Sequence, residues 1–356
     1  MNYTVWGHAP SPGLQEFAEQ LSAAMERAGF TRTADVRDVN FVLNLIDATD
    51  PKPFRRKSRG TFVAAMHELS AMPKDVLTAN YPLLVRALAN IVLCYVPGHG
   101  VWFVTPERGH YGVLSENGEA ALADAVVERL TPLASSRLVI DNDFRTDLEP
   151  ELWTGDEVTE EVKLAGRRLG ELNLLPNPFP IEDLLDERDI RQVKRLYGLG
   201  GLSYGNLSMR KDERRFWMSA SGVDKANLEI PGRDILLVSD YDAERGVIVL
   251  SVPPNVEPRR VSVDAIEHWM IYQAHPNVGA ILHVHAWMEG IHATQINYPC
   301  GTEELARSVA ELLAQEPDPD HAVIGLKNHG ITATGDGLFE ILDRIEPKIL
   351  HQVPMA

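Results

Sequence analysis

The stretch His275-Pro-Asn-Val-Gly-Ala-Ile-Leu-His283-Val-His285-Ala-Trp287 decides how the rest of the chain is interpreted. Residues 280–286 are apolar apart from two histidines and include β-branched side chains, which predicts a short buried strand. Side chains two residues apart on a strand point to one face, so His283 and His285 would aim both rings at one spot. Neutral imidazole is a frequent zinc ligand, so one metal ion could bind both rings. The alternative is a histidine pair on a solvated face, and this spacing alone does not decide between them.

Length and composition limit the class of protein. A chain of 356 residues is too long for one ordinary core, which predicts two domains. Hydrophobic residues make up 44% and charged residues 24%, as in soluble globular proteins. No basic block offsets the formal net charge of −17, which argues against a nucleic-acid partner or an anionic membrane surface. Cys94 and Cys300 have no paired spacing, so neither a disulfide framework nor a thiolate metal site is predicted.

The sequence shows no targeting signal. The first residues contain no basic segment followed by an apolar one, and no apolar run reaches membrane length. We therefore expect a cytoplasmic protein without a membrane span.

Residues 1–145 alternate strand-like and helix-like segments, which predicts a smaller α/β domain with Rossmann-like layering. The predicted strands are 4–6, 41–46, 61–66, 91–96 and 101–105, and the predicted helices are 14–28, 81–89 and 118–133. No Gly-x-Gly-x-x-Gly follows the first strand, so a dinucleotide site is not indicated. The role of this domain is unknown, and binding of a regulatory or second ligand is one hypothesis.

The polar segment 141–155 contains a proline and a glycine, which places the domain boundary there and the second domain at residues 151–356. The helices predicted in this domain are 157–175, 181–196, 263–274 and 303–313. The other predicted strands are 207–209, 215–218, 235–239, 247–252 and a pair around 327–330.

Five short motifs follow one another in this second domain. They are Gly205-Asn206-Leu-Ser208, Ser221-Gly222, Asp264 with His268 on one helix, His283-x-His285, and Asn328-His329-Gly330. In this order they resemble the class II aldolase and adducin family, which includes fuculose-phosphate aldolase, ribulose-phosphate 4-epimerase and methylthioribulose-phosphate dehydratase. The resemblance implies a three-layer α/β/α domain around a mixed sheet, and a homo-oligomer that is often a tetramer.

The metal ligands of that family match His283, His285 and His329. Three protein ligands with an open position are typical of catalytic rather than structural zinc. His329 precedes Gly330, whose missing side chain permits a tight turn toward the first two histidines. A substrate hydroxyl and carbonyl would chelate at the open position, where the cation would stabilise an enediolate. Zinc suits three imidazoles best, with manganese, iron and cobalt as alternatives.

Asp264 matches the carboxylate of the family, which is Glu in the aldolases and Asp in the 4-epimerases. A carboxylate beside a metal is suited to moving a proton. The alternative is an acid in the first turn of a helix, where the helix dipole favours it. The short side chain weakens a literal aldolase assignment. His268, one turn further along, is either a residue that supports the site or an ordinary buried histidine.

Small and polar residues match the positions at which the family holds a substrate phosphate. Small residues let backbone N–H groups approach an anion, and amide or hydroxyl side chains add donors. One hydroxyl of the family is missing, because Ser262 is followed by Val263, so a substrate carboxylate is an alternative to a phosphate. Lys225 could supply positive charge to either anion. The predicted substrate-binding residues are Gly205, Asn206, Ser221, Gly222, Lys225 and Ser262.

The resemblance implies a metal-dependent aldolase-type lyase that acts on a small, phosphorylated, sugar-like hydroxy-carbonyl compound. Epimerase, dehydratase and decarboxylase activities on the same fold are alternatives, as is an adducin-like interaction module without chemistry. The aldolases of the family also use tyrosines near the C-terminus. No tyrosine follows His329 here, so the proton donor to the leaving group is unassigned.

Overall fold

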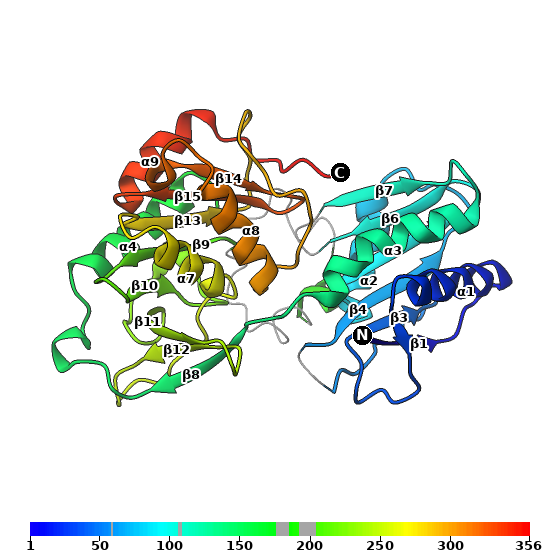
Figure 1. Cartoon of the computed structure of the whole chain (residues 1–356), viewed down its shortest axis with the longest axis horizontal. Helices are drawn as coiled ribbons and strands as arrows, with labels where there is room; N and C mark the ends of the chain where they lie inside the picture. The colour runs from blue at the N-terminus through cyan, green and yellow to red at the C-terminus, as the bar shows by residue number, and fades with distance from the viewer. Residues whose placement is uncertain (58–59, 106–108, 176–184, 192–203) are drawn as a thin grey trace. The chain divides into compact units, whose positions relative to one another are not determined.

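The computed structural model shows two compact units, which are described separately (Figure 1). It describes residues 1–57, 60–105, 109–175, 185–191 and 204–356. Unit 1 comprises residues 1–135, 179–195 and 355–356, and unit 2 comprises residues 136–178 and 196–354. The helix predicted over 181–196 lies largely outside the described residues. None of the helices in the described part of the chain combines the length and apolar character needed to cross a membrane.

Unit 1 is built on a seven-stranded mixed sheet with the order β2-β1-β3-β4-β5-β6-β7. Its strands are β1 (Asn2–Gly7), β2 (Thr31–Arg32), β3 (Phe41–Leu45), β4 (Phe62–Glu68), β5 (Ile91–Val96), β6 (Gly100–Val104) and β7 (His110–Leu114). Strands β1 to β5 pair in parallel, and β6 and β7 continue the sheet in antiparallel pairing. Parallel neighbours need crossover connections, which explains the alternating pattern of the sequence. The predicted α/β class is confirmed.

Helices cover both faces of this sheet. They are α1 (Pro12–Arg27), α2 (Val76–Arg86) and α3 (Glu119–Ser135). Helices α1 and α3 lie side by side and share a core with Leu43 and Met66 (Figure 1). Helix α2 lies on the other face, because its Asn80 hydrogen-bonds His67, the strand neighbour of Met66.

A segment from the middle of the chain also packs with unit 1. Residues 185–191 contain Asp189, whose buried carboxylate lies 2.8 Å from the guanidinium of Arg86 in α2. The Asp189 carboxylate is buried and Arg86 compensates its charge, so this contact holds the segment against unit 1. The domain limits of 1–145 and 151–356 stay a prediction.

Unit 2 contains an eight-stranded mixed sheet with the order β14-β15-β13-β9-β10-β11-β12-β8. Its strands are β8 (Asp141–Arg145), β9 (Asn206–Arg210), β10 (Phe216–Ser219), β11 (Ile235–Asp242), β12 (Val247–Ser251), β13 (Ala280–Val284), β14 (Val323–Leu326) and β15 (Gly330–Gly335). All named pairs are antiparallel except β8 with β12, which is parallel. Residues 141–145, which were predicted to lie at the domain boundary and not in a strand, thus form an edge strand.

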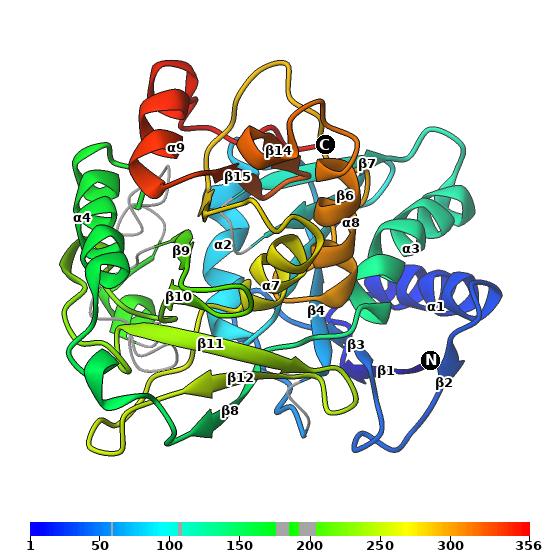
Figure 2. The same ribbon diagram turned by 60° about the vertical axis from the view of Figure 1, so that its left-hand side comes forward.

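Two helix pairs sandwich this sheet, as Figure 2 shows. Helices α4 (Glu157–Glu171) and α9 (Leu338–Ile345) pack against β9, β13 and β15 on one face, and α7 (Ala265–Ala274) and α8 (Glu303–Leu313) pack together on the other. Helix α9 was not predicted. The face is set by alternation along β13, where Leu282 points toward α4 and α9 and His283 points toward α7. His283 therefore lies on the face of the sheet that α7 covers.

The apolar face of β13 gives a stability prediction. Leu282 is fully buried, so Leu282→Ala should lower the free energy of unfolding by about 2–5 kcal/mol. Leu164→Ala is the matched control, because Leu164 in α4 is 47% exposed and its truncation should cost less than about 0.5 kcal/mol. Urea unfolding followed by tryptophan fluorescence measures both. Equal losses in the two variants would contradict the placement of Leu282 in the core.

Candidate functional site

Three histidines converge at the end of β13. His283 lies in β13, His285 follows its last residue directly, and His329 lies in the turn between β14 and β15. Their ring centroids are 4.7, 4.8 and 5.2 Å apart, and their candidate ligand nitrogens all lie within 4.8 Å of one another. The strand predicted to residue 286 ends at Val284, yet the two rings still meet. The structure thus brings together the three residues predicted as metal ligands.

The turn between β14 and β15 positions His329 beside the other two histidines. The backbone N–H of His329 donates to the Leu326 carbonyl at 3.0 Å, and Asn328 adopts a positive φ of 59°. A Cβ on Gly330 would clash with the carbonyl oxygen of Val284, so glycine lets the turn approach the end of β13 closely. Glycine at position 330 is thus needed for the close contact with β13, whereas the residue with the left-handed backbone conformation is Asn328.

The protonation state of these rings suits metal binding. The Nδ1 of His283 lies 3.0 Å from the Ile331 carbonyl oxygen, which can only accept, so Nδ1–H donates and Nε2 keeps its lone pair. That Nε2 is buried and has no hydrogen-bond partner among the described residues. Burial lowers the pKa of His283 to about 4 and the pKa of His329 to about 3. Both rings are therefore neutral at pH 7, as a metal ligand must be.

The spacing of the three rings also fits a cation. With Zn–N bonds of about 2.1 Å, tetrahedral geometry places ligand nitrogens about 3.4 Å apart. The largest separation here is at most 4.8 Å, so a small inward movement of the rings is enough. Three neutral imidazoles are suited to zinc, and the same donors also bind manganese, iron or cobalt.

A polar row crosses the sheet at His283. In the register of β9, β13 and β15, Asn206 and Thr332 are the direct neighbours of His283. Directly opposed residues share a face, so all three side chains lie under α7. The Asn206 amide donates to Asp264 Oδ2 at 2.7 Å, and the Thr332 hydroxyl donates to Glu267 Oε1 at 2.5 Å. Two carboxyl groups that are one helical turn apart thus accept hydrogen bonds from the two strand neighbours of His283.

Asp264 is a buried member of the site. It occupies the N-cap position of α7, but its side chain caps no helix N–H and bonds Asn206 in β9 instead. Its Oδ1 is buried without a hydrogen-bond partner among the described residues. Burial raises its pKa above the usual value, although the hydrogen bonds from Asn206 and from the Gly301 backbone and the charge of Lys225 favour the ionised form. These contacts argue against a helix-capping role as the reason for this residue.

Glu267 was not singled out from the sequence. It is buried under the same helix, and burial followed by the charge of Asp264 raises its pKa to about 8. A signal was present in the sequence, because Glu267 and His268 interrupt an otherwise apolar run from Ala265 to Ile271 in α7. A helix that is hydrophobic all round is buried, so an acid within it is buried as well.

His268 belongs to a second buried network on α7. Its Nδ1 lies 2.7 Å from the Ser208 hydroxyl, which lies 2.9 Å from the Tyr272 hydroxyl. Burial lowers the pKa of His268 well below its usual value. His268 is therefore a neutral ring that is hydrogen-bonded to Ser208.

The predicted substrate-binding residues fall into two groups. Asn206 and the buried Lys225 lie close to Asp264, and burial lowers the pKa of Lys225 to about 8. Gly205 has a φ of +79°, and a Cβ there would meet the His283 carbonyl, so glycine is needed for packing. The remaining three are Ser221, Gly222 and Ser262. The Ser221 N–H donates to the Arg260 carbonyl, and the Ser262 N–H donates to the Ser219 carbonyl. Their role in phosphate binding stays a prediction.

Comparison with known proteins agrees with this geometry. Residues 190–295 match the family model described as Class II Aldolase and Adducin N-terminal domain. Residues 190–295 thus match the class II aldolase and adducin family. The match includes Asp264, His283 and His285, whereas His329 lies beyond it. The family predicted from the motifs is confirmed.

Individual proteins that resemble this chain share only part of its length and have low sequence identity. A segment is 34% identical over 108 residues to methylthioribulose-1-phosphate dehydratase from Citrobacter koseri, a match that covers 30% of this chain and 45% of that protein. The chain thus spans less than half the length of this curated relative. Two similar solved structures are L-fuculose 1-phosphate aldolase, with 19% identity and a TM-score of 0.37, and the Thermus thermophilus enzyme of that name, with 20% and 0.33. Each match covers 54% of this chain, and 83% and 90% of the respective structures.

Proposed function

We propose that unit 2 is a metal-dependent aldolase-type lyase that acts on a small, phosphorylated hydroxy-carbonyl compound. The observation that carries this proposal is the cluster of three imidazoles beside the buried carboxyl group of Asp264. His283, His285 and His329 would hold one divalent cation, with zinc first and manganese, iron or cobalt as alternatives. When bound, the cation would act as a Lewis acid for negative charge on substrate oxygen atoms.

The side chains around this cluster would handle the proton. In a retro-aldol cleavage, Asp264 accepts the proton of the substrate hydroxyl that becomes the new carbonyl. The electron pair of the breaking C–C bond passes to the carbon beside the existing carbonyl, and a proton is then returned to that carbon. Asn206 donates to Oδ2 of Asp264 and leaves Oδ1 for the proton. A positioned base of this kind contributes about 10²–10⁴-fold to the rate.

Dehydration is the second candidate reaction. It is favoured by the segment that is 34% identical to methylthioribulose-1-phosphate dehydratase. In this reaction Asp264 would remove a proton from the carbon next to the carbonyl, and the hydroxyl on the following carbon would leave with a proton as water. Both reactions place negative charge next to the same carbonyl group, so the same side chains would serve either.

One assay distinguishes the two reactions. The chain is stripped of metal, reloaded with Zn²⁺ and incubated with a panel of ketose 1-phosphates and with methylthioribulose 1-phosphate. Aldehyde release that depends on Zn²⁺ supports the aldolase proposal, whereas loss of water without aldehyde supports the dehydratase. A Zn²⁺-loaded protein that converts none of these compounds would contradict both proposals.

Lys225 gives a prediction about substrate binding. Its buried ammonium group near Asp264 would pair with an anionic group of the substrate. Hydrogen bonds to charged groups contribute about 1.5–3 kcal/mol, so Lys225→Met should raise KM by roughly tenfold to a hundredfold. Lys163→Met is the control, because Lys163 lies in α4 on the opposite face of the sheet from α7 and pairs with the exposed Glu160. An unchanged KM in Lys225→Met would show that Lys225 does not bind the substrate.

A further inference from the structure

Glu267 makes a contact that neither core packing nor the proposed chemistry requires. Its Oε1 accepts the hydroxyl of Thr332, and its Oε2 is buried without a hydrogen-bond partner among the described residues. Burying a carboxyl group in an apolar helix face costs stability, and an apolar residue of the same size would fill the space. The acid at this position therefore calls for a specific role.

Thr332 connects Glu267 to two of the three histidines. Thr332 follows Ile331, whose carbonyl accepts the Nδ1–H of His283 and so leaves Nε2 available. The strand that carries Thr332 begins at Gly330, directly after His329. A hydrogen bond that fixes Thr332 therefore fixes the Ile331 carbonyl, which orients the ring of His283. It also fixes the start of β15, directly after His329.

The hydrogen bond between Thr332 and Glu267 also connects β15 to the helix that carries Asp264. Glu267 and Asp264 are one turn apart on α7, and Asp264 bonds Asn206 on the other side of His283. Helix α7 is thus anchored to the sheet on both sides of His283, through Asn206 in β9 and Thr332 in β15. Without the second anchor, the helix and β15 could shift relative to each other.

We propose that Glu267 is a positioning residue of the proposed metal centre, which acts through Thr332 to hold the rings of His283 and His329. This inference rests on the proposed function only in that the centre binds a metal ion. Partners of this kind, one step removed from the metal, typically change metal affinity by about 10–100-fold when they are replaced.

Four variants of the full-length protein test this inference: Glu267→Met, Glu267→Gln, Thr332→Val and the Glu267→Met/Thr332→Val double variant. Zn²⁺ affinity is measured by competition with a chromophoric chelator, and ligand geometry by the visible absorption of the Co²⁺-loaded protein. Glu267→Met and Thr332→Val should each weaken Zn²⁺ binding by about 10–100-fold and alter the Co²⁺ spectrum. Glu267→Gln keeps an acceptor for Thr332 and should stay within about threefold of the parent.

The double variant and a control make the test specific. If Glu267 acts through Thr332, the loss of Zn²⁺ affinity in the double variant does not exceed the larger of the two losses measured for Glu267→Met and Thr332→Val. Glu161→Met is the matched control, because Glu161 in α4 accepts from the Leu338 N–H on the opposite face of the sheet and should leave Zn²⁺ affinity unchanged. Thermal unfolding of each metal-free variant verifies that it folds, and Thr332→Val, which removes the same hydrogen bond from the other side, carries the test if Glu267→Met does not fold.

Parent-like Zn²⁺ affinity and Co²⁺ spectra in both Glu267→Met and Thr332→Val would overturn the positioning role and leave the proposed function intact. A Glu267→Gln variant that binds Zn²⁺ as weakly as Glu267→Met, or losses that add in the double variant, would overturn it as well. A parent protein that binds no Zn²⁺ would overturn the proposed function together with this inference.

Discussion

Replacing His329 with alanine is expected to weaken Zn²⁺ binding by at least about a hundredfold, because a ligand is lost rather than a supporting contact. The ring of His329 completes a triangle with centroid distances of 4.7 and 4.8 Å to the rings of His283 and His285. Turnover of any substrate should be lost to the same extent at limiting metal concentration. Competition with a chromophoric chelator measures the affinity of parent and variant.

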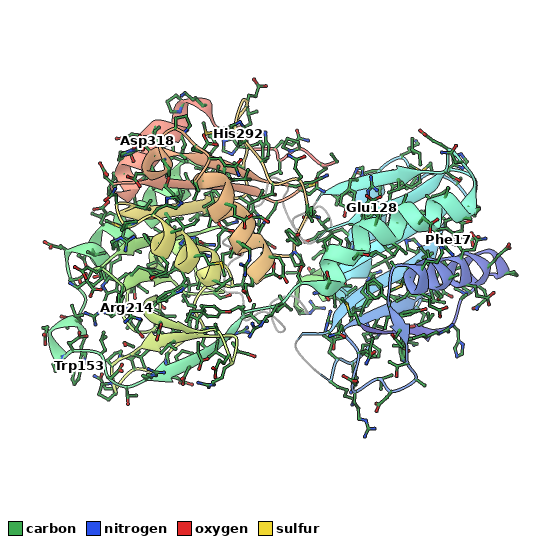
Figure 3. All side chains as sticks on the ribbon, viewed as in Figure 1. Phe17, Glu128, Trp153, Arg214, His292 and Asp318 are labelled. Carbon is green, nitrogen blue, oxygen red and sulfur yellow. The ribbon has the colours of Figure 1, made fainter. Side chains whose placement is uncertain are left out.

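His292→Ala is the matched control for this substitution. His292 lies in the same unit (Figure 3), its side chain is 70% exposed, and its Nδ1 lies 2.6 Å from Glu316. Its replacement should leave Zn²⁺ affinity unchanged. If His292→Ala and His329→Ala reduce metal binding equally, the protein binds metal at its surface and the cluster is not the site.

The second large effect is expected at Asp264. Asp264→Asn keeps the size of the side chain and a partner for Asn206, but it removes the group that would accept the proton. We expect kcat to fall by about 10²–10⁴-fold, the usual contribution of a general base. Because Asp264 is not among the clustered ligand residues, Zn²⁺ affinity should stay within about threefold of the parent.

Asp318→Asn provides the comparison for Asp264→Asn. Asp318 is 63% exposed and lies at the periphery of unit 2, where it pairs with His321 (Figure 3). Steady-state kinetics and metal titration are carried out on both variants. A parent-like kcat in Asp264→Asn would exclude Asp264 as the base, and a parallel loss of metal and kcat would assign it to metal binding instead.

The three-histidine cluster could be predicted from the sequence because local rules determine much of it. Alternation along one strand places two rings together, and motif order supplies the third. The physical reason for Gly330 needed the structure, since a clash with the Val284 carbonyl involves residues far apart in the chain. The same limit applies to Glu267, whose partner Thr332 is 65 residues away.

Errors in the fold have similarly specific causes. The helix predicted over 81–89 spans Val76–Arg86, because Asp75 caps it and Pro82 is tolerated inside it. Residues 141–145 were predicted to lie at the domain boundary, and no strand was predicted there, because the segment is polar. They are mostly exposed at the edge of a sheet, where strands need few apolar residues. Edge strands therefore lack the signal that identified the buried strands.

The central claim is that His283, His285 and His329 together hold one catalytic cation. X-ray diffraction from crystals grown with Zn²⁺, with data collected on both sides of the zinc absorption edge, tests it most directly. We predict one strong anomalous peak within bonding distance of all three rings, including Nε2 of His283. Absence of a peak there, or a peak bound by fewer than three of these rings, would contradict the account.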